Sequence, residues 1–197
     1  THWVREILEF GGPDPDRRLK ARSEMIAFLL GQIEARAAGG GDHDDILSHL
    51  LTAEVDGQPV PKEHVLGTLI LLLIAGVDTT WSAIGSSLHH LATHPDDRER
   101  LVEEPELLPT AIEELLRAYS PVTMARIVSE DVEYKGCPMK KGDRVLMSFA
   151  AANRDPEAFE DADQVILDRQ RNRHVAFGVG IHRCAGSNLA RMEMRVA

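Results

Sequence analysis

The chain of 197 residues has few of the residues on which several classes of protein depend. Its only two cysteines, Cys137 and Cys184, are too few and too far apart for a disulfide scaffold or a structural zinc site. Basic residues number 22 against 32 acidic ones, and the formal net charge of −10 excludes a nucleic-acid binder driven by global charge. We therefore expect a reducing, cytoplasmic setting and no nucleic-acid partner.

Long apolar segments are also scarce. The longest run, residues 65–77, has 13 residues, whereas a membrane-spanning helix needs about 20. This run predicts a buried core helix and no membrane partner. Thr1 is not an initiator, and residues 188–197 have helical periodicity without a stop signal, so we expect an internal fragment of a longer protein.

Most of the first 120 residues follow a 3.6-residue apolar period, which predicts a mainly helical region. Pro61 begins a long helix that runs to about Thr93. Such a helix of roughly 30 residues is about 45 Å long, more than a small bundle needs, and it indicates a larger parent fold. Helices are predicted at residues 3–10, 18–36, 44–52, 61–93, 96–104 and 107–119.

The pattern changes after residue 120. Short strands are predicted at residues 123–128, 132–134 and 144–149. Residues 153–173 lose periodicity and are rich in Asp, Arg and Pro, which predicts an ordered meander on the core. We expect one domain, with a helical part at 1–120, a small β part with the meander at 121–173, and a loop with the start of a helix at 174–197.

The most specific motif is Phe177-Gly-Val-Gly-Ile-His-Arg-Cys-Ala-Gly186, which leads into a helix. Its first two glycines permit positive φ, so the loop can fold back beneath a flat macrocycle, and Gly186 would let the backbone approach that macrocycle. A helix N-terminus would stabilise the Cys184 thiolate, and Phe177 would shield its sulfur. Six matched positions favour a heme-thiolate loop over the alternative, a glycine-rich turn ending in a buried cysteine.

A second motif, Ala75-Gly-Val-Asp-Thr-Thr80, places an acid and two alcohols in the middle of the long apolar helix, where they are costly unless used. The Thr79 hydroxyl can bond the carbonyl four residues earlier and open the helix locally, which would make a groove for dioxygen and water. The alternative is a polar kink or a satisfied buried network.

A third motif, Glu114-Leu-Leu-Arg117, places a carboxylate and a guanidinium on one helix face. Such pairs are common as solvated surface decoration, so the motif alone has little weight. Its value comes from its order along the chain, after the acid-alcohol helix and before Arg126 and the cysteine loop.

With these motifs in this order, the sequence resembles the soluble bacterial members of the cytochrome P-450 superfamily over essentially its whole length. The resemblance implies a mainly α fold with a small β-sheet and a meander. Residues 61–93 correspond to the long central I helix, 107–119 to the K helix, and Cys184 onward to the L helix. The family domain is about twice as long, so the N-terminal half of the fold is missing.

The resemblance also implies roles for single residues. Cys184 becomes the proximal iron ligand of heme b, while Arg126 and His182 become partners of the heme propionates. Asp78 and Thr79 become the acid-alcohol pair of oxygen activation. The distal substrate pocket would be lined by residues that are equally plausible as plain core: Leu71, Ile74, Ala75, Val122 and Met124.

By the same resemblance, Glu114 and Arg117 become a structural pair that holds the meander. The family usually completes this pair with an arginine in the meander. The matching position here is expected to be Gln164, which would be a departure from the family pattern.

Charge is unevenly distributed. Residues 169–197 contain six arginines against the single acid Glu193, so this segment is positive in a negative chain. The basic patch around Cys184 suits an acidic redox partner: a ferredoxin, a flavodoxin-type protein or a fused reductase. The alternative is that several of the arginines pair internally with Asp155, Asp161, Asp163 or Asp168.

The implied activity is that of a heme-thiolate monooxygenase. Such an enzyme inserts one atom of dioxygen into a small apolar organic substrate with electrons from NAD(P)H. Two alternatives remain: a peroxygenase or isomerase on the same fold, and a non-catalytic helical fragment that binds no heme. The acid-alcohol pair favours the oxygenase, because members of the family that bypass oxygen activation generally lack it.

Overall fold

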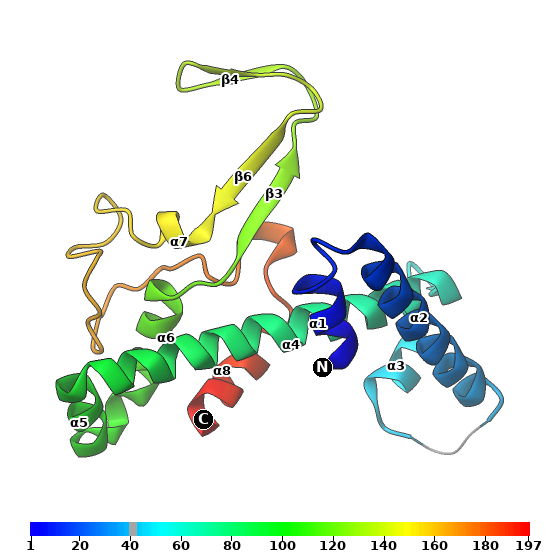
Figure 1. The fold of residues 1–197 in the computed structure, drawn as a ribbon, viewed down its shortest axis with the longest axis horizontal. Coiled ribbons are helices and arrows are strands. Elements are labelled where there is room, and N and C mark those ends of the chain that lie inside the picture. The colour runs from blue at the N-terminus through cyan, green and yellow to red at the C-terminus, as the bar shows by residue number, and fades with distance from the viewer. Residues whose placement is uncertain (40–42) are drawn as a thin grey trace. The chain divides into compact units, whose positions relative to one another are not determined.

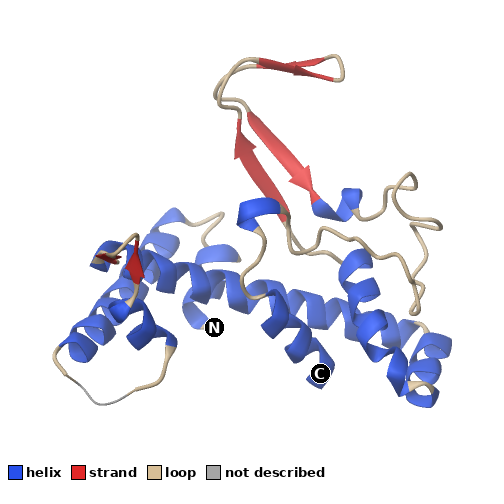
Figure 2. Ribbon diagram, turned by 180° about the vertical axis from the view of Figure 1, so that it is seen from behind, coloured by secondary structure: helices blue, strands red, loops and turns tan. Residues whose placement is uncertain are grey.

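The computed structural model describes residues 1–39 and 43–197, which form two compact units, residues 1–78 and 79–197. Helices dominate both units (Figures 1 and 2). The helices are α1 (His2–Leu8), α2 (Pro15–Ala37), α3 (Ile46–Thr52), α4 (Lys62–Thr93), α5 (Pro95–Glu103), α6 (Leu108–Ala118), α7 (Phe149–Ala152) and α8 (Ser187–Val196), with the 3-10 turns η1 (Pro105–Leu107) and η2 (Gly180–His182). The strands are β1 (Glu54–Val55), β2 (Gln58–Pro59), β3 (Thr123–Ile127), β4 (Val132–Tyr134), β5 (Cys137–Met139) and β6 (Arg144–Ser148).

The first unit is built on α2. Asp14 caps this helix by accepting a hydrogen bond from the backbone N–H of Arg17 at 3.0 Å, and Pro15 occupies the first helical position. Buried residues recur every four positions along α2, so a single face of the helix packs inward. Those residues are Ala21, Met25, Leu29 and Ile33.

Helix α4 has nearly the bounds predicted for the long helix. Ala83, Ser87 and His90 are buried along one face. In the described residues it is the one helix long and apolar enough to cross a membrane, judged by length and composition alone, a test that core helices of soluble proteins also pass. The expectation of a buried helix at residues 65–77 is wrong for much of that run, because Leu71 and Leu72 are exposed, and Trp81 and Leu88 are exposed further along the helix.

The C-terminal end of α4 is fixed by a buried histidine. The side chain of His90 is 2% exposed. Its Nδ1 lies 2.8 Å from the Tyr119 hydroxyl, just after α6, and its Nε2 lies 2.8 Å from Oδ2 of Asp97 on α5. One side chain therefore joins three helices of the second unit.

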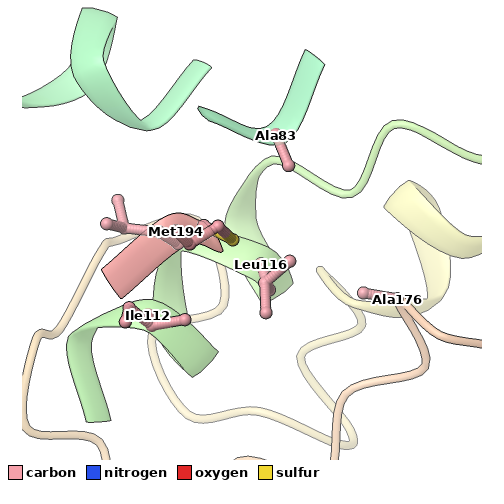
Figure 3. Close-up of a cluster of buried hydrophobic side chains, with 6 residues drawn as sticks. Ala83, Ile112, Leu116, Ala176 and Met194 are labelled. Carbon is pink, nitrogen blue, oxygen red and sulfur yellow. The ribbon is translucent and has the colours of Figure 1, made fainter. Parts of the chain in front are cut away.

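The core of the second unit lies between α6 and α8. Figure 3 shows Ile112 and Leu116 of α6 beside Met194 of α8, with Ala83 of α4 and Ala176 close by. Phe177 packs against this cluster. The apolar core thus reaches the start of the cysteine loop.

The strands of the second unit form two separate ribbons. In β3 and β6, Thr123 pairs with Ser148 and Ile127 with Arg144, while β4 and β5 form a hairpin beyond their ends (Figure 1). Strand β5 was not predicted, because Pro138 weakens its strand pattern. Residue 149 was predicted to end a strand but begins α7, where the Ser148 hydroxyl caps the helix.

Candidate functional site

The cysteine loop has the backbone that its glycines predict. Gly178 and Gly180 have φ values of 68° and 69°, in the left-handed region that favours glycine. The N–H of Cys184 donates a hydrogen bond of 2.8 Å to the carbonyl of Phe177, which closes the loop on itself. Cys184 is exposed and forms no disulfide, and the same is true of Cys137.

The position of Cys184 relative to the helix needs a correction. We expected the helix to begin at the cysteine, but α8 begins at Ser187 with Gly186 as its N-cap. A 3-10 turn, η2, precedes the cysteine, and the Cys184 carbonyl accepts a 3.4 Å hydrogen bond from the Ser187 N–H. The sulfur therefore lies in the approach to the helix rather than within its first turn.

Phe177 and Gly186 lie on opposite sides of the cysteine in the chain. A Cβ atom at residue 186 would lie 3.9 Å from the Cys184 sulfur, so glycine leaves the space beside the sulfur free of a side chain. The Phe177 ring is half-buried and faces the guanidinium of Arg191 at 4.6 Å from the ring centroid.

The Glu-x-x-Arg pair is completely buried, since Glu114 and Arg117 are both 0% exposed. Arg117 donates to Glu114 through Nε and Nη2, both at 2.8 Å. It also donates to three backbone carbonyls of the meander at 2.7 Å, those of Asn153, Ala162 and Gln164. This geometry supports a structural role for the pair.

The expected departure in the meander is wrong. Arg169 completes the triad, because its Nε lies 3.0 Å and 2.9 Å from the two Glu114 oxygens. Gln164 instead contributes its backbone carbonyl to Arg117. Burial alone raises the pKa of Glu114, but hydrogen bonds from Arg117, the Ile166 N–H and Arg169 hold that pKa below its ordinary value.

The acid-alcohol pair lies in an unbroken stretch of α4. Asp78 and Thr79 are half-buried neighbours, and the helix continues through them, so the predicted local opening is not seen. A hydroxyl can bond a carbonyl four residues earlier without breaking the helix. Thr68 does so at 2.8 Å and Thr93 at 2.9 Å in this same helix.

The other predicted cofactor contacts are exposed. Within the described residues, Arg126 on β3 donates only to the neighbouring Ala125 carbonyl, at 2.9 Å, and His182 ends η2. The predicted pocket residues fall in both units: Leu71, Ile74 and Ala75 lie on α4 in the first, and Val122 and Met124 lie at or beside β3 in the second. A common pocket for these five stays a prediction.

The six arginines of residues 169–197 divide into two groups. Arg169 pairs with Glu114, and Arg191 pairs with Glu113. The internal partners are thus glutamates of α6 rather than the aspartates considered from the sequence. In the described residues the other four side chains make no ion pair or hydrogen bond: Arg171, Arg173, Arg183 and Arg195.

Sequence reasoning missed a second charged cluster. Glu113 accepts hydrogen bonds from Arg191 on α8 and from His174, just before the loop. These contacts join residues 61 and 78 positions apart. Glu113 directly precedes the Glu-x-x-Arg motif. The opposite charge of Arg191 on α8 was the one feature of the sequence that could have indicated this pairing.

These loops, helices and buried pairs are those of one family. Residues 14–197 match the family Cytochrome P-450, and the chain belongs to it. Heme is the cofactor of that family.

Known relatives and solved structures support the same family assignment. The chain is 40% identical to linalool 8-monooxygenase of Pseudomonas putida, with 99% of the chain and 49% of that protein covered. It is 38% identical to the methyl-branched lipid omega-hydroxylase of Mycobacterium bovis, over 100% of the chain and 47% of the relative. Its fold matches the cytochrome PksS of Bacillus subtilis with a TM-score of 0.93 and 36% identity, over 100% of this chain and 50% of that one. The chain spans about half the length of the curated relatives it matches.

Proposed function

We propose that the protein containing this chain is a heme-thiolate monooxygenase of the soluble bacterial type. The observation that carries the proposal is Cys184, an exposed free thiol in a loop of fixed backbone directly before α8. Residues 1–197 would supply the I, K and L helices of a single cytoplasmic domain. This assignment fits the names of the two relatives, a monooxygenase and a hydroxylase.

The residues around Cys184 fit a thiolate-ligated heme. The sulfur is accessible, and Gly186 leaves the space beside it open for a flat group. Arg126 and His182, both exposed, would hold the heme propionates through charge and hydrogen bonds. When bound, heme b supplies an iron that binds dioxygen, and thiolate donation favours cleavage of the O–O bond.

Asp78 and Thr79 would deliver protons from solvent to the reaction. Cleavage of dioxygen to product and water consumes protons, and a water-excluding apolar pocket cannot supply them without a relay. The Thr79 hydroxyl would hold an ordered water and donate a proton at its oxygen, and the Asp78 carboxylate would replace that proton from solvent. With electrons derived from NAD(P)H, one oxygen atom enters the substrate and the other leaves as water.

The substrate would be a small apolar organic molecule. We assign its pocket to the apolar residues predicted from the sequence, which carry no charge that could compensate a buried ion. Linalool and a methyl-branched lipid, named for the two relatives, are of this chemistry. The pocket residues are Leu71, Ile74, Ala75, Val122 and Met124.

Electrons would arrive at the basic face around Cys184. Four exposed arginines of residues 169–197 have no acidic partner in the described chain, so their charges are available to an acidic protein. A ferredoxin, a flavodoxin-type protein or a fused reductase fits this charge. The exposed apolar side chains of α4 would be covered by the other half of the domain rather than by a membrane.

The decisive experiment follows labelled dioxygen in the full-length protein with a competent redox partner and a screen of small apolar substrates. A monooxygenase places one labelled atom in the product and one in water. Product that forms only when hydrogen peroxide is added indicates the peroxygenase. An unlabelled rearranged product indicates the isomerase, and a protein that binds no heme contradicts both the proposal and these rivals.

A further inference from the structure

Arg191 is the centre of a cluster of side chains that reaches the cysteine loop. Its Nε and Nη2 donate to the two carboxylate oxygens of Glu113, the second at 2.8 Å. Its Nη1 donates at 3.3 Å to the carbonyl of Ser187, the first residue of α8. The guanidinium is therefore fixed at all three nitrogens, so its plane has little freedom.

His174 ties the same carboxylate to the segment that enters the loop. Its Nε2 lies 3.0 Å from Oε2 of Glu113, and its Nδ1 accepts the N–H of Ala176 at 3.2 Å. An Nδ1 that accepts a backbone N–H leaves the hydrogen on Nε2, which is the nitrogen that faces the carboxylate. The histidine side chain is 4% exposed, so this bridge is largely shielded from water.

Phe177 connects the cluster to Cys184. The Arg191 guanidinium carbon lies 4.6 Å from the centroid of the phenylalanine ring, within the range of a cation-π contact. The His174 ring centroid lies 6.1 Å from it. The carbonyl of Phe177 accepts the Cys184 N–H, so the cluster restrains both the ring and the backbone that hold the cysteine.

The charges of the cluster are consistent with this role. Burial alone raises the pKa of Glu113, but the hydrogen bonds from Arg191 and His174 lower it to about 2, so the carboxylate is ionised at neutral pH. The hydrogen bond to Glu113 raises the pKa of Arg191. Arg191 is thus a fixed positive charge that reaches the cysteine loop through the Phe177 ring.

We infer that Arg191 is a positioning residue for the thiolate: held by Glu113 and His174, it clamps Phe177 and places a permanent positive charge near Cys184. The inference rests on the proposed heme-thiolate function. A nearby cation draws electron density from the thiolate, and charge and hydrogen bonding around an axial ligand tune the reduction potential of the iron.

The test uses heme-loaded, full-length protein and three variants. Arg191→Gln removes the charge and the planar guanidinium that donates two hydrogen bonds to Glu113. Arg191→Lys keeps the charge but loses the planar fork and the stacking on Phe177. Arg195→Gln is the matched control, because Arg195 is an exposed arginine on the same helix with no side-chain partner in the described chain, so it changes net charge equally.

Hydrogen exchange of the backbone amides of residues 177–186 and the reduction potential of the heme are the two measurements. Loss of charged hydrogen bonds predicts roughly tenfold faster loop exchange in both Arg191 variants. The potential becomes more negative in Arg191→Gln and stays nearer that of the parent in Arg191→Lys. Arg195→Gln changes neither quantity.

Unchanged loop exchange in both Arg191 variants, or equal potential shifts in Arg191→Gln and Arg195→Gln, overturns the inference. If Arg191→Gln fails to load heme, the loop exchange of Arg191→Lys still tests the inference, and unchanged exchange in that variant overturns it. The ferrous-carbonyl spectrum of the unmutated protein distinguishes failure of the proposed function from failure of this inference. A spectrum without thiolate ligation removes the proposed function and this inference together, whereas a thiolate spectrum with unresponsive variants removes this inference alone.

Discussion

Proton-carrying side chains are rare along the apolar middle of α4. Between His64 and His89, Asp78 is the only ionisable residue of this helix. A relay that uses the helix therefore has one candidate acid, and the adjacent Thr79 is the hydroxyl beside it. Thr80 is the next alcohol in the chain and serves as a natural comparison.

We predict that Thr79→Ala uncouples turnover in the full-length enzyme. NAD(P)H would still be consumed. The yield of hydroxylated product would fall several-fold, and hydrogen peroxide would form in its place. Asp78→Asn would slow oxygen consumption itself about 100-fold, because the proton supply is limited. The ratio of product to NAD(P)H, with peroxide assayed in parallel, measures both effects. Thr80→Ala is the control, and equal behaviour of all three variants would assign the protons to another route.

Glu113 should make the stability of the fold depend on pH. Its pKa is about 2 in the fold against an ordinary value of 4.5. Because the pKa is lowered in the fold, the contribution of ionised Glu113 to the free energy of unfolding is fully present above about pH 4.5. It is lost as the pH falls toward 2. Allowing for its part exposure, the contribution is about 2 kcal/mol.

Glu113→Gln should therefore lower the melting temperature most near neutral pH, and the difference from the parent protein should shrink as acid is added. Thermal unfolding over this pH range checks the expectation. Glu106→Gln, an exposed glutamate of η1, controls for the loss of one charge. A difference that stays constant with pH would show that the ion pairs of Glu113 do not contribute.

Helix α6 carries the two buried side chains that hold the meander in the second unit. Its Arg117 donates hydrogen bonds to three backbone carbonyls of the meander, and its Glu114 accepts one from the backbone N–H of Ile166. Removing one partner of a fully buried pair leaves the other charge uncompensated, which costs about 3–5 kcal/mol.

We predict that Glu114→Ala fails to incorporate heme, because Arg117 and Arg169 then lack their shared carboxylate. Heme content per folded chain is the measurement, and Glu106→Ala is the exposed control on the preceding turn. A Glu114→Ala protein that folds with full heme content and only turns over slowly would contradict the structural role.

Local features of the fold could be predicted from the sequence, whereas contacts between distant elements could not. The bounds of α4 and α6 are set by local chemistry, apolar periodicity and proline, and were predicted to within a few residues. The positive φ of Gly178 and Gly180 is equally local. Contacts between elements are not local. The choice of Arg169 over Gln164 as the partner of Glu114 depends on how the meander folds back over 55 positions, which no spacing rule fixes.

The chain spans about half the length of its relatives. Several large apolar side chains of α4 are exposed, with Leu71 at 64%. Apolar surface of this kind is costly in water, and in a complete domain it would be covered. Experiments on function therefore need the full-length protein.

The ferrous-carbonyl absorption spectrum of the full-length protein and of two cysteine variants tests whether Cys184 is the thiolate ligand of the heme. The unmutated protein and Cys137→Ala should both show the band characteristic of thiolate ligation, because Cys137 lies in the exposed hairpin strand β5. Cys184→Ala should lose that band. A band that survives in Cys184→Ala, or that disappears in Cys137→Ala, would contradict the assignment of Cys184 as the thiolate ligand.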